Sequence, residues 1–322
     1  MQAKWCGRCA LALAVMVGIE FPVSEGSSAG VGQAEESSRA AAAAELDAAL
    51  AEGQLERALE LAEEIAAAEQ DEYFEALVRV VAILCRQGKK EEAVAAVRAA
   101  LDAGFWNFRR LLEDPSLTLI NRDDGFRAMV RTARTRQYIQ MLERDSRDEM
   151  QKPEEVMASL AFRPGERVAD VGAGSGYFTI PIAKAVGSEG KVWAVDIQQA
   201  MLDFIADRLS GEGLRNVELV LAEPDDPRLP ARGVDTILMV DTMHYVKQRA
   251  AYGAKLSAAL APDGRLVIID FRYDPDAKRE FAPPPEQQVP REALDADLAA
   301  AGFRVVKSFD FLPEQYFVVY QK

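Results

Sequence analysis

The pattern of apolar and polar positions divides the chain into two parts. From about residue 37 to residue 134, apolar residues recur at three- and four-residue spacing among alanine, leucine and glutamate, which predicts helices throughout. After a charged connector within residues 131–156, short apolar runs alternate with helical patterns. We interpret the runs as seven strands, at residues 167–172, 191–196, 217–222, 234–241, 265–270, 304–311 and 315–322.

Alternation of strands and helices is typical of a doubly wound sheet. The second part is therefore predicted to be an α/β domain with a mainly parallel, seven-stranded, Rossmann-like sheet. Only a short turn around Pro313 separates the last two strands, and a connection this short predicts a hairpin. The last strand is therefore expected to be antiparallel, in a fold preceded by an all-α helical-repeat domain.

The helical part contains an internal repeat. "GQLERALELAEEI" (residues 53–65) returns as "GKKEEAVAAVRAA" (residues 88–100), with Ala58 and Ala93 as small residues where two helices would cross. The period resembles the tetratricopeptide repeat, a helix-turn-helix unit. This resemblance implies a groove for a peptide or protein partner, and the alternative is a helical cap over the second domain. Further along, a capping core is expected from Trp106, Phe108 and Leu112.

The N-terminus resembles an export signal. A short basic stretch precedes the apolar residues 9–19, which are too few to span a bilayer, and small residues follow up to Ala29 and Ala34. We expect an exported, periplasmic protein; the alternative is an uncleaved N-terminal helix on a cytoplasmic protein. The expected domains are a signal peptide at 1–34, a tetratricopeptide-like domain at 35–135 and the α/β domain at 136–322.

Composition narrows the classes of function. The net charge of −14 argues against a general nucleic-acid binder, which needs a basic face to neutralise phosphates. No segment after the leader is long and apolar enough to predict a stable membrane span. Of the three cysteines only Cys85 lies outside the leader, so no intrachain disulfide is expected and Cys85 is interpreted as a core residue.

The clearest candidate site follows the first predicted strand, in "VADVGAGSGYFT" (residues 168–179). Its glycines have the spacing G-x-G-x-G, whereas a dinucleotide-binding loop has G-x-G-x-x-G. Glycine allows a backbone to turn sharply and to approach a ligand closely. Acidic residues accompany the loop, one before the glycines and one at the end of the next strand. The candidate residues are Asp170, Gly172, Gly174, Gly176 and Asp196.

Together, "DVGAGSGYFT", "VDIQQAML" and "LAPDGRLVIID" resemble the class I S-adenosylmethionine-dependent methyltransferases, over residues 148–322. The C-terminal "DFLPEQYFVVY" resembles an exported bacterial group of methyltransferase-like proteins. The resemblance implies S-adenosylmethionine as cofactor, with the glycines near its methionine and ribose portions. It also implies that Asp196 accepts both ribose hydroxyls and that Asp170 orders the loop near the amino end. The other expected cofactor-binding residues are Ile197, Glu223 and Pro224, although many members have glycine where this chain has Ala222.

Candidate catalytic residues lie after the fourth predicted strand, in "DTMHYV". Ligands of open α/β sheets lie at the carboxyl ends of the strands, so Asp241, His244 and Tyr245 are expected to face the transferred methyl. His244, the only histidine, suits removal of a proton from an oxygen or nitrogen acceptor. The alternative is a polar residue that caps a helix or orders the loop. Asp241 and Asp270 could share a divalent ion, but carboxylates also gather at strand ends without metal, and we predict no metal site.

The predicted function is therefore methyl transfer from S-adenosylmethionine to a small-molecule or protein acceptor. An alternative of another class is a non-catalytic, repeat-containing binding or scaffold protein that retains the methyltransferase fold. The expected export favours that alternative, because the cofactor is made in the cytosol. A nicotinamide-dependent oxidoreductase is disfavoured by the glycine spacing and by the terminal hairpin.

Overall fold

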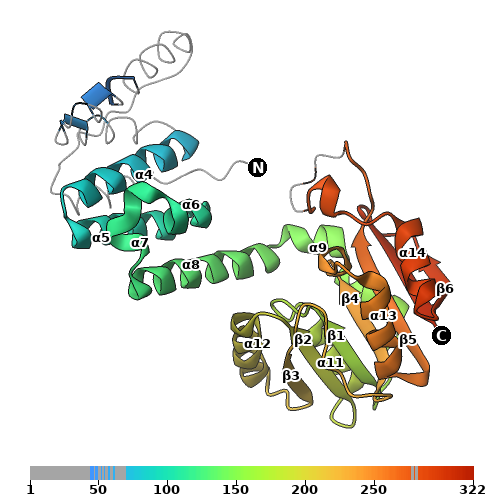
Figure 1. The fold of residues 1–322 in the computed structure, drawn as a ribbon. Coiled ribbons are helices and arrows are strands. Elements are labelled where there is room, and N and C mark those ends of the chain that lie inside the picture. The colour runs from blue at the N-terminus through green and yellow to red at the C-terminus, as the bar shows by residue number, and fades with distance from the viewer. Residues whose placement is uncertain are drawn as a thin grey trace, which may run out of the picture. The chain divides into compact units, whose positions relative to one another are not determined.

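The computed structural model divides the chain into two compact units, Met1–Gln137 and Tyr138–Lys322 (Figure 1). It describes residues 70–276, 279 and 282–322, with only the backbone at 70–76, and residues 44–46, 48–49, 52, 54, 57–58 and 61. The expected signal peptide at 1–34 and most of the first repeat unit at 53–65 lie outside the described residues. Among the helices that are described, none combines the length and apolar character needed to cross a membrane.

The described part of the first unit is helical. Its elements are α4 (Gln70–Arg86), α5 (Lys90–Asp102), α6 (Phe108–Glu113), η1 (Pro115–Leu117), α7 (Thr118–Asn121) and the first part of α8 (Asp124–Leu142). Ala58, Cys85 and Ala93 are buried in one apolar core. The expected capping role of Trp106 is wrong, because its side chain is 65% exposed while the neighbouring Phe105 is buried.

A seven-stranded sheet of order β3-β2-β1-β4-β5-β7-β6 forms the second unit. The first five strands are parallel, and β7 is antiparallel to both of its neighbours, which confirms the predicted antiparallel last strand and its hairpin. Strands covered on both faces read as continuous apolar runs, which is why their positions follow from sequence. The strands are β1 (Arg167–Val171), β2 (Lys191–Asp196), β3 (Val217–Leu221), β4 (Val234–Val240), β5 (Leu260–Phe271), β6 (Arg304–Phe309) and β7 (Gln315–Gln321).

Strand β5 is longer than its sequence pattern predicts. The predicted strand covers residues 265–270, but β5 begins at Leu260 and includes residues 262–264. Pairing with β4 jumps from Val234 opposite Leu260 to Thr236 opposite Arg265. Residues 261–264 therefore form an irregularity within β5, because the strand pairs with β4 both before and after them.

Helices cover both faces of the sheet (Figure 1). One apolar cluster joins the sheet to α13 and α14, and others on the opposite face join it to α10, α11 and α12. Consecutive strand residues alternate between the clusters, so Val168 belongs to one and Ala169 to the other. The helices are α9 (Ser146–Gln151), α10 (Pro153–Leu160), α11 (Thr179–Val186), α12 (Gln199–Glu212), α13 (Arg249–Ala259) and α14 (Arg291–Ala300), with the short η2 (Met243–Tyr245) and η3 (Pro285–Gln287).

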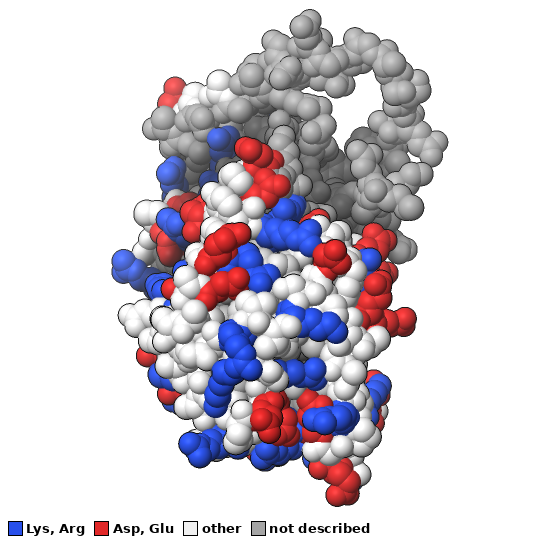
Figure 2. Space-filling model, turned by 90° about the vertical axis from the view of Figure 1, so that its right-hand side faces the viewer, with Lys and Arg blue, Asp and Glu red and all other residues white. Residues whose placement is uncertain are grey.

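Charged side chains of both signs share the surface. Figure 2 shows Lys and Arg side chains interspersed with Asp and Glu over one face of the molecule. Many pair with neighbours, as in Arg249 with Asp297 at 2.7 Å and Arg291 with Asp295 at 2.8 Å. On the described residues of that face, the charges do not form the continuous basic field by which proteins bind phosphate backbones.

Candidate functional site

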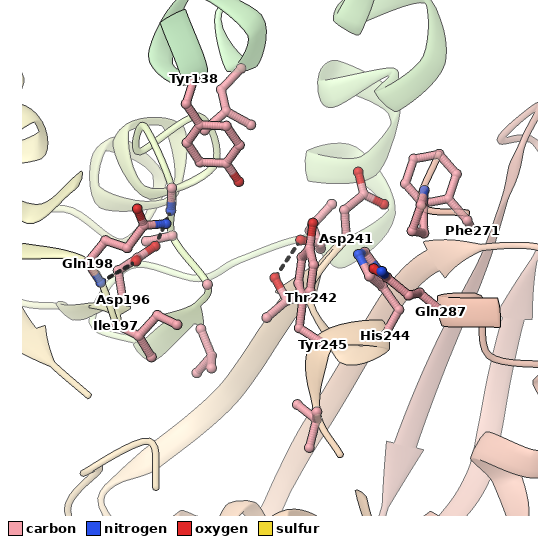
Figure 3. Close-up of a pocket in the computed structure, with 18 of the residues that line it drawn as sticks. Tyr138, Asp196, Ile197, Gln198, Asp241, Thr242, His244, Tyr245, Phe271 and Gln287 are labelled. Atoms are coloured by element: carbon pink, nitrogen blue, oxygen red, sulfur yellow. Dashed lines mark hydrogen bonds between the residues drawn. The ribbon is translucent and has the colours of Figure 1, made fainter. Parts of the chain in front are cut away.

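A cavity of about 440 Å³ lies at the carboxyl ends of β1, β2 and β4 in the second unit (Figure 3). This volume is within the ~300–1,000 Å³ usual for small-molecule sites. The loops after these strands and after β3 supply part of the lining. Residues from 138 to 150 and from 282 to 287 supply more of it, together with Tyr252 and Phe271. Most of the sequence-predicted residues line it: Gly172, Gly174, Asp196, Ile197, Glu223, Pro224, Asp241, His244 and Tyr245.

The first two loop glycines occupy positions that a side chain could not fill without a change in the structure. Gly172 has φ of +79°, and a Cβ there would lie 2.2 Å from Oγ1 of Thr242. A Cβ on Gly174 would lie 3.1 Å from Cδ1 of Leu142. The loop backbone therefore passes directly against its neighbours, and its turn depends on the left-handed conformation that glycine adopts most readily.

Asp196 ends β2 on one side of the cavity, beside Ile197 and Gln198 (Figure 3). Its Oδ2 accepts the N–H of Gly174 at 2.9 Å, and its Oδ1 accepts the N–H of Gln198 at 2.9 Å. Burial raises the pKa of this carboxyl group. A carboxylate has about four acceptor positions, so each oxygen can accept a further hydrogen bond from a ligand. The adjacent Ile197 side chain is 55% exposed and offers apolar surface.

Two predicted residues, Asp170 and Gly176, lie outside the described lining of the cavity. The buried Asp170 accepts a hydrogen bond from Thr179 Oγ1 at 2.6 Å, which ties the end of β1 to the first turn of α11. Burial raises the pKa of Asp170 to about 6. A Cβ on Gly176 would lie 3.1 Å from Ile205 of α12. Asp170 and Gly176 therefore contact the helices α11 and α12, which hold the glycine loop in place.

Glu223 lines the cavity, but its carboxylate is already paired. Its Oε1 accepts from Arg228 at 2.7 Å, and its backbone N–H donates to the carbonyl of Asp226. The backbone at this point therefore turns back on itself, with Pro224 inside the turn. Ala222, where many members of the family have glycine, is buried directly before it.

His244 and Asp270 form a buried pair. Asp270 Oδ2 accepts the backbone N–H of His244 at 3.0 Å, and its Oδ1 lies 2.7 Å from His244 Nδ1. The two side chains are 3% and 2% exposed. Because the carboxylate accepts, the ring proton belongs on Nδ1, which leaves a lone pair on Nε2. Nε2 is buried and has no hydrogen-bond partner within the described residues.

Asp241 lies on the same side of the cavity as His244 (Figure 3). Its carboxylate accepts hydrogen bonds from the side-chain amides of Gln151 and Gln315, and its backbone has φ of +49°. Burial, assisted by the negative charge of Asp270, raises the pKa of Asp241 to about 7. Across the described residues, no group of three or more His, Cys, Asp or Glu is arranged to hold a metal ion.

Sequence reasoning missed the contribution of residues 138–151, which we expected to be a charged connector. Glu143 accepts from Ser175 Oγ at 2.5 Å and pairs with Arg208 at 3.0 Å, so this segment is fastened to the glycine loop and to α12. Tyr138 lines the cavity, and burial raises its pKa to about 12. The segment contains no glycine and follows no strand that the structure describes. Its role arises from tertiary contacts, so no local sequence pattern marks it.

Comparisons with known proteins agree with this geometry. Residues 168–264 match the family described as methyltransferase domain. A solved S-adenosylmethionine-dependent methyltransferase from Aquifex aeolicus is 31% identical, with a TM-score of 0.53 over 56% of this chain and 95% of that one. This chain therefore belongs to the S-adenosylmethionine-dependent methyltransferases, enzymes whose cofactor is S-adenosylmethionine.

Curated relatives that match part of this chain are also methyltransferases. The ubiquinone/menaquinone biosynthesis C-methyltransferase UbiE of Teredinibacter turnerae is 34% identical over 110 residues, which are 34% of this chain and 44% of the relative. The aklanonic acid methyltransferase DauC of a Streptomyces species is 31% identical over 123 residues, 37% of this chain and 56% of the relative. The chain thus spans about half the length of the curated relatives it matches.

Proposed function

We propose that the chain transfers a methyl group from S-adenosylmethionine to an oxygen or nitrogen atom that must lose a proton. The acceptor is a small molecule or a protein side chain. One observation carries this proposal: His244 Nε2 is buried at the lining, has no partner in the described residues, and belongs to a ring held by Asp270. A bare ring nitrogen held by a carboxylate is the arrangement of a general base.

The lining residues fit the cofactor. S-adenosylmethionine supplies a methyl group on a positively charged sulfur. Asp196 has free acceptor positions for the two ribose hydroxyls, and Ile197 and Pro224 offer apolar surface for the adenine. Asp196 and Asp241 place carboxyl groups along the cavity, which suits a cationic ligand. Asp170 and Gly176 act from behind the loop, by holding it in place.

The acceptor would lie on the other side of the cavity, against Tyr245 and Phe271. The His244 ring lies between these two aromatic rings, with centroid distances of 4.1 Å to Tyr245 and 6.2 Å to Phe271. His244 Nε2 takes the acceptor's proton, and Asp270 stabilises the imidazolium that results. The protein's remaining contribution is to hold acceptor and cofactor in line, which lowers the entropic part of the barrier.

A turnover assay tests this proposal. Wild-type protein is incubated with S-adenosylmethionine and a panel of phenols, carboxylic acids and amines, and S-adenosylhomocysteine is measured. Turnover above the acceptor-free rate is expected, with a loss of about a hundredfold or more in His244→Gln. Full activity in that variant would contradict the role of His244 as base. Cofactor binding without turnover on any acceptor would favour the non-catalytic scaffold.

For the N-terminal part we propose export by the leader and binding of a peptide or protein partner by the tetratricopeptide-like helices. The sequence pattern supports both statements. Mass analysis of the protein from the cell envelope tests export, since a mature chain that begins after Ala29 or Ala34 is expected. A chain that retains Met1 would contradict cleavage.

A further inference from the structure

Two aromatic side chains lie next to the His244 ring, and they differ in exposure. Phe271 is 3% exposed, whereas Tyr245 is 64% exposed and lines the cavity. Figure 3 shows both on the side of the cavity that holds His244, away from Asp196. An aromatic ring left open to a cavity offers a large, rigid apolar face to a ligand. Tyr245 therefore provides a flat apolar surface beside the ring of the proposed base.

This side of the cavity has no positive side chain to hold an anionic acceptor. Among the lining residues that the structure describes, no Lys or Arg comes from β4, β5 or the loops that follow them. Both lining arginines come from residues 138–150, and the guanidinium of Arg147 lies 4.1 Å from the centre of the Tyr177 ring, beside the glycine loop. A carboxylate or phosphate near His244 would meet the carboxyl groups of Asp241 and Asp270, which disfavours an anionic acceptor.

The hydrogen-bonding groups of the lining favour a single hydroxyl group. Within the described lining, His244 Nε2 is the buried side-chain acceptor that lacks a hydrogen-bond partner. A hydroxyl brings one O–H donor, whereas an ammonium group brings three N–H donors. An ammonium acceptor would also face the positive sulfur of the cofactor across the transferred methyl, and like charges repel. One uncharged hydroxyl group therefore matches the bare nitrogen.

The strength of the base distinguishes phenols from aliphatic alcohols. A phenol has a pKa of about 10, whereas the O–H of water, which an aliphatic alcohol resembles, has a pKa of about 16. An imidazole takes a proton far more readily from the more acidic group. A phenol also carries a flat ring that can stack on Tyr245. The base and the exposed ring therefore both favour an aromatic hydroxyl compound.

We propose that the methyl acceptor is an uncharged phenol, whose ring packs on Tyr245 and whose hydroxyl donates to His244 Nε2. The inference rests on the proposed function, because it takes His244 as the base and the cavity as the cofactor site. As Nε2 takes the proton, the phenol oxygen forms a bond to the methyl carbon, and the electrons of the carbon–sulfur bond remain on sulfur. The products are an aryl methyl ether, S-adenosylhomocysteine and one proton, which leaves from His244.

Calorimetry on wild-type protein saturated with S-adenosylhomocysteine tests the substrate class without turnover. The probes share one bicyclic skeleton: 2-naphthol, the saturated decahydro-2-naphthol, the anion 2-naphthoate and the cation 2-naphthylmethylammonium. 2-Naphthol should bind about fivefold or more tightly than each of the others, because only it combines the flat ring with an uncharged hydroxyl. No binding of 2-naphthol, or equal or tighter binding of any of the other three, would overturn the proposal.

Variants of Tyr245 test the stacking contact. Tyr245→Ala removes the ring and should weaken 2-naphthol binding by about threefold to tenfold, while affinity for S-adenosylhomocysteine stays within about twofold. Tyr245→Phe keeps the ring and should restore the affinity for 2-naphthol. An equal loss in the two variants, or no loss in Tyr245→Ala, would overturn the proposed contact.

Product analysis separates this inference from the proposed function. With S-adenosylmethionine present, wild-type protein should convert 2-naphthol to 2-methoxynaphthalene, measured by mass spectrometry, and should leave decahydro-2-naphthol unmethylated. Methylation of an amine or a carboxylate, but of no phenol, would overturn the phenol assignment while the proposed methyl transfer stands. No binding of S-adenosylhomocysteine to well-folded wild-type protein would instead contradict the proposed function.

Discussion

At the scale of single residues, the site depends on a pair of side chains that no local motif connects. Asp270 accepts from both the ring and the backbone of His244, and its Oδ1 also accepts the N–H of Phe271. Each oxygen therefore has a donor facing it. The pair fixes which ring nitrogen is bare, and this is the feature that a proton-transfer role requires.

Asp270→Asn should reduce turnover by at least about a hundredfold while affinity for S-adenosylhomocysteine stays within a few-fold. The new amide group would donate to His244 Nδ1 and so move the ring proton to Nε2. It would also face a backbone N–H, so we expect a lower melting temperature. Steady-state kinetics, calorimetry and thermal denaturation measure the three quantities. Activity near that of the wild type would show that the ring proton does not matter.

Asp241 should make the stability of the protein depend on pH. Its pKa in the folded protein, about 7, lies above that of an unfolded aspartate, so the folded state binds the extra proton between about pH 4 and pH 7. Stability from this group is therefore lost as pH rises, by up to ~1.4 kcal/mol per pH unit. Relative to wild type, Asp241→Asn should gain in free energy of unfolding between pH 5 and pH 8. Urea denaturation at both values checks this, and a difference that does not change with pH would contradict it.

The sequence predicted the residues whose positions follow from a strand end. Gly172, Gly174 and Asp196 all line the cavity, because parallel strands bring their carboxyl ends to one edge. Arg147 reaches the same cavity from a helix before the first strand, and no spacing rule relates it to the glycine loop. Trp106 shows the opposite error: its aromatic side chain predicts a core position, whereas in this turn Phe105 is buried instead.

At the scale of elements, the loop after β1 depends on the absence of a side chain at Gly172. Gly172→Ala requires a non-glycine residue at φ of +79° and places a Cβ 2.2 Å from Thr242. Backbone strain of this kind costs about 1–3 kcal/mol, and the clash adds to it. We expect a lower melting temperature and weaker binding of S-adenosylhomocysteine.

Gly187→Ala is the matched control for this loop. Gly187 also has a positive φ, +67°, but a Cβ there meets nothing within 4 Å. Gly187→Ala should lose stability only through backbone strain, and it should keep its affinity for the cofactor. If the two alanine variants were destabilised equally and bound S-adenosylhomocysteine equally well, close packing of the Gly172 loop would not matter for the site.

The helices and strands differ in how accurately the apolar pattern of the sequence predicts their bounds. The buried strands β1, β2 and β4 were predictable to within about a residue at each end, because both faces are covered and most of their residues are apolar. The start of β5 was not, since Pro262 and Gly264 read as a turn although pairing continues past them. The segment at 138–151 was predicted as a connector because its function depends on contacts with Ser175 and Arg208, far away in sequence.

At the scale of the whole molecule, the second unit should fold and bind its cofactor alone. Among the residues that the structure describes, those that line the cavity all belong to Tyr138–Lys322. We expect a fragment of residues 138–322 to keep affinity for S-adenosylhomocysteine. A fragment of residues 152–322 should lose it, because the lining residues from 138 to 150 and the contact between Gln151 and Asp241 are removed. Calorimetry on both fragments measures this. Aggregation of the longer fragment, with rescue by the separately expressed helical unit, would show instead that the helices are a structural cap.

The central claim is that this cavity is a site for S-adenosylmethionine. Calorimetric titration of the purified protein with S-adenosylhomocysteine and with NAD tests it most directly, with Asp196→Ala as the variant. We predict one binding site per chain for S-adenosylhomocysteine, a rise in melting temperature when it binds, and no binding of NAD. Asp196→Ala should weaken binding by about tenfold or more with the fold intact. Equal binding of NAD, or no binding of S-adenosylhomocysteine to well-folded wild-type protein, would contradict the account.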